Sequence, residues 1–354
     1  MGAAAMRRFD YSSLPERLRS PELVAQLLAL RELKGRQGAL NLTSPRILES
    51  LREGAVVQST GASNRIEGIV TTERRLHGIV SGSVAPRNRD EQEIAGYRDV
   101  LGLIHERHDY INVTPSVILQ LHRDMMRHTP SSFGGRWKDS DNVIVARDPS
   151  GNPTVRFRPM PASLTPSAME ALCSAYRDAV RGGVHDPLLL SMLFVFDFVS
   201  IHPFNDGNGR MSRLLTVLLM ERCGYEVPRY VSIERGVEAS KGQYYEVLAA
   251  SSVGWMEGEN DASPFVSYML AIITGAYRRL FELAGGTGAG AATKAGRVAA
   301  VFERRLGKVT KRDIREECPD ISDSTIEREL RRLLDEGAIE KVGGGRSTGY
   351  VRQT

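Results

Sequence analysis

The sequence predicts a mostly α-helical protein with one β-hairpin in its main part and a small appended unit at the C-terminus. Apolar residues recur at helical spacing along most of the 354 residues, and aromatic residues make up only 6%. This pattern is interrupted once, by two short β-rich runs. A Gly-rich linker at 285–296 then precedes three further helical stretches and a second pair of β-rich runs. We therefore divide the chain into 1–90, 91–284, 285–296 and 297–354.

The N-terminal part reads as a series of helices with clear start signals. Ser20-Pro21, Ser44-Pro45 and Thr114-Pro115 each combine an N-cap residue with a proline suited to the first helical turn. The helical patterns cover 20–37, 44–60, 89–108 and 114–129. Between the second and third of these, residues 61–80 predict a short helix interrupted by Gly61 and Gly68.

The central part begins with the hairpin and continues with a buried helix. Residues 143–146 and 155–157 are the two β-rich runs, and a Pro/Gly/Asn turn separates them. Residues 186–202 are apolar on nearly all sides, which predicts a helix buried at the centre of the protein. Gly224 is placed to end the helix that follows. The remaining helical patterns cover 165–180, 209–224, 240–252 and 262–284.

The C-terminal unit has the element order of a winged helix-turn-helix. Helices are predicted at 296–305, 310–317 and 322–336, and two short strands flank a Gly-rich loop within 338–353. This unit also carries most of the excess positive charge. Residues 291–354 hold 14 Lys and Arg against 11 Asp and Glu, while the net charge of the chain is +4.

Composition favours a cytoplasmic protein. The three cysteines are far apart in sequence and form no metal-binding or disulfide pattern. The N-terminus lacks the apolar run of a signal peptide, and the longest apolar stretch, near Leu188, is too short to span a bilayer. We expect no membrane association.

The densest group of polar residues, "HPFNDGNGRMSR", follows the buried helix. The proline after His202 ends that helix, which places the imidazole on a loop. Gly207 to Gly209 then open the next helix, whose free N–H groups and positive dipole end favour an anion such as phosphate. Arg210 and Arg213 lie three residues apart in the first turn of this helix, on neighbouring faces, and can both reach the same anion. Asp206 could hold Mg²⁺ beside a phosphate, and His202 could remove a proton from a hydroxyl.

These residues resemble the signature of the Fic family, HPFx(D/E)GNGR, followed by a second arginine three residues later. Most Fic proteins transfer AMP from ATP to a hydroxyl group of a protein. The resemblance implies a helical Fic fold, ATP as substrate, Mg²⁺ as cofactor, His202 as the base and Asp206 as the metal ligand. It places five residues on the phosphates: Gly207, Asn208, Gly209, Arg210 and Arg213. Gly209 favours AMP transfer, because the Doc branch usually carries lysine there and transfers a phosphoryl group.

Two further segments resemble parts of this family. The hairpin occupies the place of its flap, here about 141–159, whose edge pairs with the backbone of the target; we therefore nominate Val143, Ile144 and Val145. The segment "GQYYEVL" resembles the lining of the adenosine pocket and nominates Tyr244 and Tyr245, although a tyrosine pair on a helix can also serve packing alone. Ser251-Ser252 stands where some relatives carry Asn, which leaves the recognition of adenine open.

"SNRIEG", residues 63–68, resembles the inhibitory motif (S/T)xxxE(G/N) of class II Fic proteins. Ser63 and Glu67 are four residues apart and share one helical face. The resemblance implies that Glu67 pairs with Arg213 and occupies the arginine that the γ-phosphate of ATP requires. A surface salt bridge is the alternative.

Three functions therefore stay open. The first is an autoinhibited adenylyltransferase that modifies a Ser, Thr or Tyr hydroxyl of a target protein, and itself. The second is a nucleotide-sensing regulator that binds DNA through the winged helix, although the mixed charges of 322–336 are unfavourable for phosphate binding. The third is the reverse reaction, removal of AMP, with Glu67 positioning water. A homodimer is possible. Walker A and HExxH motifs are absent from the sequence.

Overall fold

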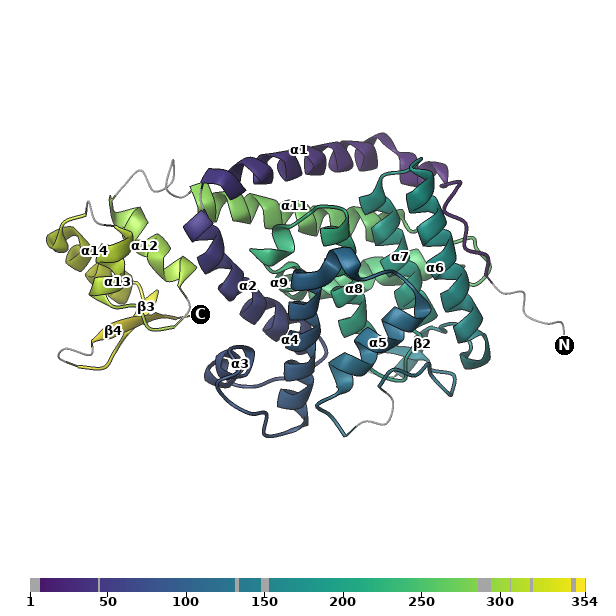
Figure 1. The fold of residues 1–354 in the computed structure, drawn as a ribbon, viewed down its shortest axis with the longest axis horizontal. Coiled ribbons are helices and arrows are strands. Elements are labelled where there is room, and N and C mark those ends of the chain that lie inside the picture. Colours follow the sequence, from purple (N-terminus) through teal and green to yellow (C-terminus); the bar gives the residue numbers. More distant parts are fainter. Residues whose placement is uncertain are drawn as a thin grey trace.

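The computed structural model describes residues 7–43, 45–130, 134–147, 153–285, 294–305, 307–318, 321–344 and 348–353. The fold is mostly helical, as predicted (Figure 1). The N-terminal elements are η1 (Glu16–Arg19), α1 (Pro21–Thr43), α2 (Pro45–Ile66), α3 (Glu73–Val80), α4 (Arg89–Arg107), η2 (His108–Tyr110) and α5 (Pro115–Met126). The central elements are β1 (Ile144–Arg147), β2 (Pro153–Phe157), η3 (Ala162–Leu164), α6 (Thr165–Gly182), α7 (Pro187–Ile201), α8 (Asn208–Arg222), η4 (Val227–Arg229), α9 (Ile233–Ala239), α10 (Lys241–Ser252) and α11 (Ser263–Gly285). The sequence patterns missed α9 and the short 3-10 helices η3 and η4 among these central elements.

Helix α7 lies at the centre of the main core. All of its residues except Pro187 and Val199 are buried, and it packs against α6, α8 and α11. Its one ionisable residue, Asp197, accepts hydrogen bonds from Tyr11 Oη (2.6 Å) and Trp255 Nε1 (2.7 Å), which satisfies the carboxylate inside the core. This burial supports the prediction from the apolar pattern and fixes the point at which the following loop leaves the core.

The prediction of a helix break at Gly61 was wrong. Helix α2 continues through Gly61 to Ile66 and ends before Gly68, whose φ of +82° suits glycine. A Cβ at Gly61 would lie 2.7 Å from the Leu76 side chain, so the glycine serves close packing of α2 against α3. As a result Ser63 lies in the last turns of one long helix, and Glu67 follows its end.

The hairpin consists of β1 and β2, which pair antiparallel with a register shift between Ile144 and Val145. Side chains alternate along the first strand and the residue before it: Val143 and Val145 are exposed, whereas Ile144 is partly buried. The turn of the predicted hairpin, 148–152, lies outside the described residues. Strand β2 packs against α10, which brings the hairpin next to the segment that contains Tyr244 and Tyr245.

The C-terminal elements have the predicted order and form a hydrophobic core of their own. They are α12 (Lys294–Arg304), α13 (Lys311–Glu317), α14 (Asp323–Asp335), β3 (Ile339–Val342) and β4 (Gly349–Arg352). Val309, between α12 and α13, also pairs with Tyr350 of β4. Figure 1 shows this unit at one end of the molecule, beside α2, which α12 contacts. Most of the predicted linker, 286–293, lies outside the described residues.

None of the helices in the described part of the chain has both the length and the apolarity that crossing a membrane requires.

Candidate functional site

The loop between α7 and α8 carries His202 in an unusual backbone conformation. His202 ends α7 with φ 53° and ψ 62°. Among the described residues, all others with a positive φ are glycines. Pro203 disfavours the right-handed helical conformation at His202. Such a conformation costs on the order of 1–3 kcal/mol and persists only where the surroundings fix it. The loop therefore holds His202 in a defined position at some cost in stability.

The Asn208 side chain closes this loop. Its Oδ1 accepts a hydrogen bond from the Phe204 N–H (2.9 Å) and its Nδ2 donates to the Phe204 carbonyl (2.7 Å). Phe204 is fully buried and stacks on His122, with ring centroids 3.7 Å apart. Since both ends of the Asn208 amide bond to Phe204, a contact of Asn208 with phosphate would come from its backbone N–H at the start of α8.

His122 supports the same loop from α5. Its Nδ1 accepts a hydrogen bond from the Gly135 N–H (3.1 Å), so its Nε2 carries the proton and donates to the Asp206 carbonyl (3.1 Å). Gly207 must lack a side chain here: its φ is +81°, and a Cβ would lie 3.3 Å from His122 Nε2. The neutral imidazole of His122 on α5 thus holds the turn at Asp206-Gly207 in place.

Burial lowers the pKa of His202 to about 4, and the nearby Lys138 charge contributes to this shift. Burial likewise lowers the pKa of His122 to about 4. Both imidazoles are therefore neutral at pH 7. A neutral His202 can accept a proton without first losing one, which is the state that a general base requires.

We expect the free energy of unfolding to fall as the pH falls from about 6.5 toward 4. The unfolded chain binds protons at these histidines below about pH 6.5, whereas the folded protein does not until about pH 4. Each imidazole should cost roughly 1–2 kcal/mol at pH 5. Urea unfolding at pH 7 and pH 5 measures the loss, and a His202→Ala variant should show about half of it. An equal loss in both proteins would contradict the assignment to His202.

A cavity of about 210 Å³ opens beside His202. It brings together residues from the end of α2, the hairpin, the α7–α8 segment and α10. Of the residues nominated from the sequence, seven line it: Glu67, Ile144, His202, Gly209, Arg213, Tyr244 and Tyr245. Arg156 and Ser252 line it as well. The first turn of α8 forms one wall, so its unpaired N–H groups lie at the cavity.

Arg213 is held by the motif at the end of α2. It donates from Nε to Ser63 Oγ (2.8 Å) and from Nη2 to the Ser63 carbonyl (2.9 Å), and it pairs with Glu67 Oε1 at 2.7 Å. The Arg213 side chain is 6% exposed and that of Glu67 32%. A Cβ at Gly209 would lie only 2.1 Å from Glu67 Oε1. The Glu67 carboxylate thus covers the first turn of α8 and neutralises the arginine in the cavity.

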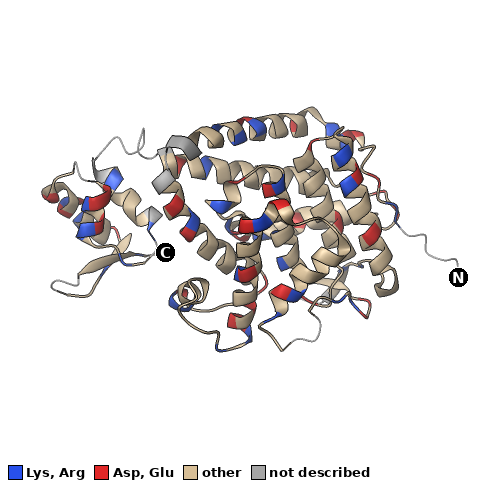
Figure 2. Ribbon diagram, viewed as in Figure 1, with Lys and Arg blue, Asp and Glu red and all other residues tan. Residues whose placement is uncertain are grey.

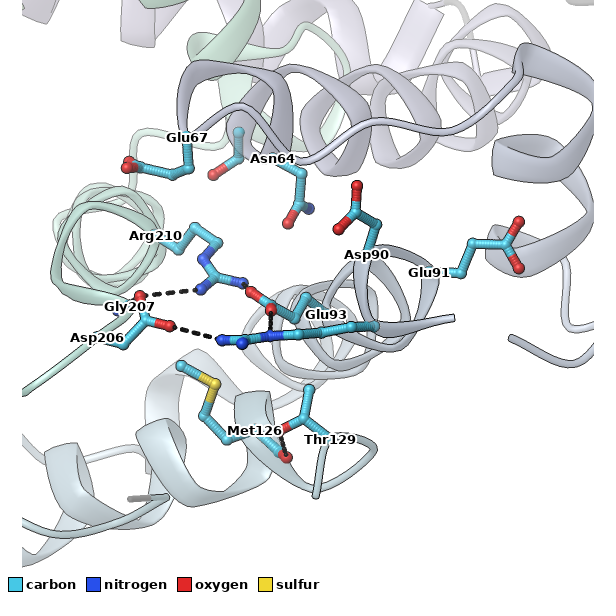
Figure 3. A network of polar contacts seen from close by, with 12 residues as sticks. Asn64, Glu67, Asp90, Glu91, Glu93, Met126, Thr129, Asp206, Gly207 and Arg210 are labelled. Carbon is cyan, nitrogen blue, oxygen red and sulfur yellow. Dashed lines mark hydrogen bonds and ion pairs between the residues drawn. The ribbon is translucent and has the colours of Figure 1, made fainter. Parts of the chain in front are cut away.

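Arg210 does not line this cavity, and Figure 3 shows it between Glu93 and Asp206. It is buried and pairs with Glu93 Oε2 at 2.6 Å, and its Nη2 lies 3.7 Å from Asp206 Oδ1. Arg89 bridges the same two acids, at 2.7 Å from Glu93 and 3.4 Å from Asp206. Arg210 is therefore part of a charged network around Asp206, outside the cavity that Arg213 lines.

Asp206 is suited to a metal ion that arrives with a nucleotide. Its side chain is 50% exposed. Oδ1 accepts the Gly207 N–H at 2.6 Å, whereas the contact of Oδ2 among the described residues is the long one with Arg89, at 3.4 Å. Among the described residues, no three His, Cys, Asp or Glu side chains are grouped as ligands. Mg²⁺ often uses one or two carboxylates together with substrate phosphates, and a single exposed carboxylate fits that mode.

The aromatic wall of the cavity comes from α10. Tyr244 is buried, and burial raises its pKa to about 12. Tyr245 is partly buried and contacts Tyr244 edge-on, with centroids 5.4 Å apart. Arg156 of β2 lies over the Tyr245 ring at 5.6 Å and, in the part of the chain that the structure describes, forms no ion pair. Sequence reasoning missed Arg156, although it lies within the second β-rich run of the predicted hairpin, 155–157.

Comparisons with known proteins find similarity to Fic proteins. Residues 112–220 match the family model described as the Fic/DOC family. The chain is 26% identical over 270 residues to Protein adenylyltransferase Fic of Aedes aegypti, covering 73% of this chain and 49% of that protein. It is 27% identical over 212 residues to Protein adenylyltransferase fic-1 of Caenorhabditis elegans, covering 58% and 37%. The chain thus spans about half or less of the length of these curated relatives.

Solved structures share the fold. A crystal structure of a Fic family protein from Desulfovibrio desulfuricans G20 superposes with a TM-score of 0.63 at 22% identity and covers 98% of both chains. A Fic domain containing signaling protein from Bacteroides thetaiotaomicron gives 0.60 at 21% identity, over 73% of this chain and 97% of that chain. The first of these likenesses extends over the C-terminal unit as well as the main core.

Proposed function

We propose that this protein is an adenylyltransferase that moves AMP from ATP to a hydroxyl group of a target protein. The observation that carries the proposal is the cavity that joins a neutral histidine, the N-terminal turn of α8 and Arg213. The relatives named protein adenylyltransferase support the reaction type. Gly209, which lines the cavity, supports it too, because the phosphoryl-transferring Doc branch usually carries lysine at this position.

In the reaction, His202 removes the proton from the target hydroxyl, and the oxygen attacks the α-phosphorus of ATP. The bond between the α-phosphorus and the bridging oxygen to the β-phosphate breaks, and pyrophosphate leaves with the electron pair. The N–H groups at the start of α8 and the Arg213 guanidinium face the negative charge that develops on the phosphates. Tyr244 and Tyr245 form the wall against which the nucleoside would lie.

Mg²⁺, when bound with ATP, would neutralise phosphate charge and favour departure of pyrophosphate. Asp206 would hold it through Oδ2, and Arg89 would give up its long contact with that oxygen.

An Asp206→Ala variant should therefore need more Mg²⁺ and lose at least about tenfold in AMP transfer, while binding ATP without metal as before. The measurement is a Mg²⁺ titration of the transfer rate beside ATP binding in EDTA. An Arg17→Ala variant, which removes the exposed ion pair with Asp261, serves as the control. The same Mg²⁺ dependence in variant and parent would argue against Asp206 as the ligand.

We assign the Glu67–Arg213 pair to autoinhibition. The Glu67 carboxylate occupies the space over Gly209 and bonds to the arginine that would otherwise face a phosphate. ATP could bind, but its γ-phosphate would be displaced from Arg213. Ser63 adds two bonds to the same guanidinium and so strengthens the inhibited arrangement.

The hairpin offers a docking edge for the target. Val143 is 39% exposed and Val145 55%, while Ile144 between them lines the cavity. A target segment added alongside β1 would gain main-chain hydrogen bonds and place a side chain toward His202. Val143, Ile144 and Val145 therefore serve as the proposed docking surface.

For the C-terminal unit we propose a winged helix that contacts protein. Its three helices, the β3–β4 hairpin and the added Val309 pairing support this fold. Figure 2 shows basic and acidic residues mixed on its helices. Several of its basic side chains pair with acids: Lys311 with Glu327, Arg312 with Glu316, Arg315 with Asp323 and Arg332 with Glu336. This neutralisation disfavours DNA, whose binding requires free cations to meet phosphates.

Incubation with labelled ATP distinguishes AMP transfer from phosphoryl transfer and from the absence of transfer. The full chain and a Glu67→Gly variant are incubated with Mg²⁺, α-labelled ATP and cell lysate. The proposal expects label on protein, including self-labelling, and more of it with the variant. Label from γ-labelled ATP alone would instead indicate phosphoryl transfer, and the absence of any label with both proteins would refute AMP transfer.

A further inference from the structure

Residues 138–142, the stretch directly before the hairpin, are bonded to both sides of His202. The Lys138 N–H donates to the Pro203 carbonyl (2.8 Å), and Lys138 Nζ donates to the Ile201 carbonyl (3.1 Å). Asn142 Nδ2 donates to the Phe204 carbonyl (3.3 Å). The carbonyls immediately before and after His202, and the next one along, thus all accept from this one stretch.

Lys138 is an unusual residue to find in this place. It is 3% exposed, and burial lowers its pKa to about 8. Across the described residues its ammonium group forms no ion pair within 4 Å; Asn142 Oδ1 is its other partner, at 3.0 Å. Asp141 favours this charge only at longer range, and burying a charge without a direct ion pair is costly. The Ile201 carbonyl, at the negative end of α7, recovers part of that cost.

The strained backbone of His202 explains what these bonds accomplish. A positive φ at a non-glycine residue persists only when neighbouring contacts fix it. Asn208 fixes the far side of the loop through Phe204, and Lys138 fixes the near side through Ile201 and Pro203. Without Lys138 the near side loses the side-chain bond at the last turn of α7, next to the imidazole.

The same stretch leads into β1. Asn142 binds both Lys138 and the Phe204 carbonyl, and Ile144, two residues later, begins the strand and lines the cavity. The docking edge of the hairpin and the His202 loop are thereby connected through two side chains.

We propose that Lys138 is a positioning residue for His202, and that with Asn142 it ties the orientation of the imidazole to the hairpin. This inference rests on the proposed function, since His202 is the base of that reaction. A misplacement of a reacting group by about 1 Å can cost about 100-fold in rate. Removing the Lys138 side chain should therefore slow transfer and leave the binding of ATP intact, because Lys138 does not line the cavity.

The test uses the full chain carrying Glu67→Gly as the parent. Lys138→Met is expected to lower kcat about 10- to 100-fold, with KM for ATP changed less than about threefold. Lys138→Arg, which keeps a cationic donor, should recover part of the loss, and Asn142→Ala should lower kcat by a smaller factor. Lys34→Met is the matched control: Lys34 Nζ donates to the Cys223 carbonyl (2.6 Å) at the end of α8, away from the cavity.

A second readout does not depend on activity. The NMR signal of the His202 imidazole, identified by its absence in His202→Ala, should shift in Lys138→Met and stay in place in Lys34→Met. A folded Lys138→Met protein with kcat within threefold of the parent and an unmoved His202 signal overturns the positioning role. If the parent transfers no AMP but the His202 signal still shifts in Lys138→Met, the positioning of His202 is supported and the proposed function is refuted separately.

Discussion

A His202→Ala variant is expected to lose AMP transfer by about 10²- to 10⁴-fold while still binding ATP. His202 is the neutral imidazole at the cavity, and burial holds its pKa at about 4. Among the described residues that line the cavity, Glu67 is the other group that could accept a proton, and it is engaged with Arg213. The variant is therefore best made with Glu67→Gly, so that this carboxylate cannot substitute as a base.

The measurement is the initial rate of labelling from α-labelled ATP, beside ATP binding by calorimetry. His128→Ala is the matched control, because His128 lies outside the cavity and pairs with Asp99 at 2.7 Å. If the His202 variant labels protein at a rate close to that of the parent, another group is the base. A loss of ATP binding in step with the rate would indicate that the loop had collapsed.

Much of the site follows from local signals in the sequence. Pro203 after His202 and Gly207 before α8 determine a loop whatever packs around it, because they act through backbone geometry. The apolar stretch before His202 could only be a buried helix, and α7 is one. Ser63 in the last turns of α2 and Glu67 directly after its end both contact Arg213, although the predicted helix would have included Glu67. The pairing itself was expected from the family resemblance rather than from spacing.

Other features depend on contacts between distant segments. Gly61 suggested a helix break, yet α2 continues because the glycine admits Leu76 of α3. Arg210 and Arg213 were expected to reach one anion. Instead, Arg210 forms an ion pair with Glu93 of α4, away from the cavity that Arg213 lines. Lys138 carried no signal, because its role comes from carbonyl groups more than 60 residues later in the chain. Such contacts depend on tertiary packing between distant segments, and the hydrophobic periodicity of the sequence carries no information about them.

The Glu67→Gly variant is expected to transfer AMP, and to label itself, about 10- to 100-fold faster than the parent. Arg213 bonds to Glu67 at 2.7 Å in a site where the guanidinium is 6% exposed. A hydrogen bond to a charged group contributes on the order of 1.5–3 kcal/mol, and each 1.4 kcal/mol that favours the inhibited state lowers the competent fraction about tenfold. Glycine also clears the space over Gly209 for a phosphate.

Arg213→Ala distinguishes inhibition from a structural salt bridge. It breaks the same ion pair but also removes the group that faces the γ-phosphate, so it should lower transfer where Glu67→Gly raises it. Ser63→Ala should give a smaller gain than Glu67→Gly, because Arg213 keeps its bonds to the Ser63 carbonyl and to Glu67. Rates of self-labelling for the three variants, with thermal unfolding as a check on folding, provide the comparison.

If Glu67→Gly labels no faster than the parent while folded, the pair does not inhibit transfer. If the variant instead fails to release AMP from a modified target that the parent restores, Glu67 belongs to the reverse reaction, in which its carboxylate would orient water.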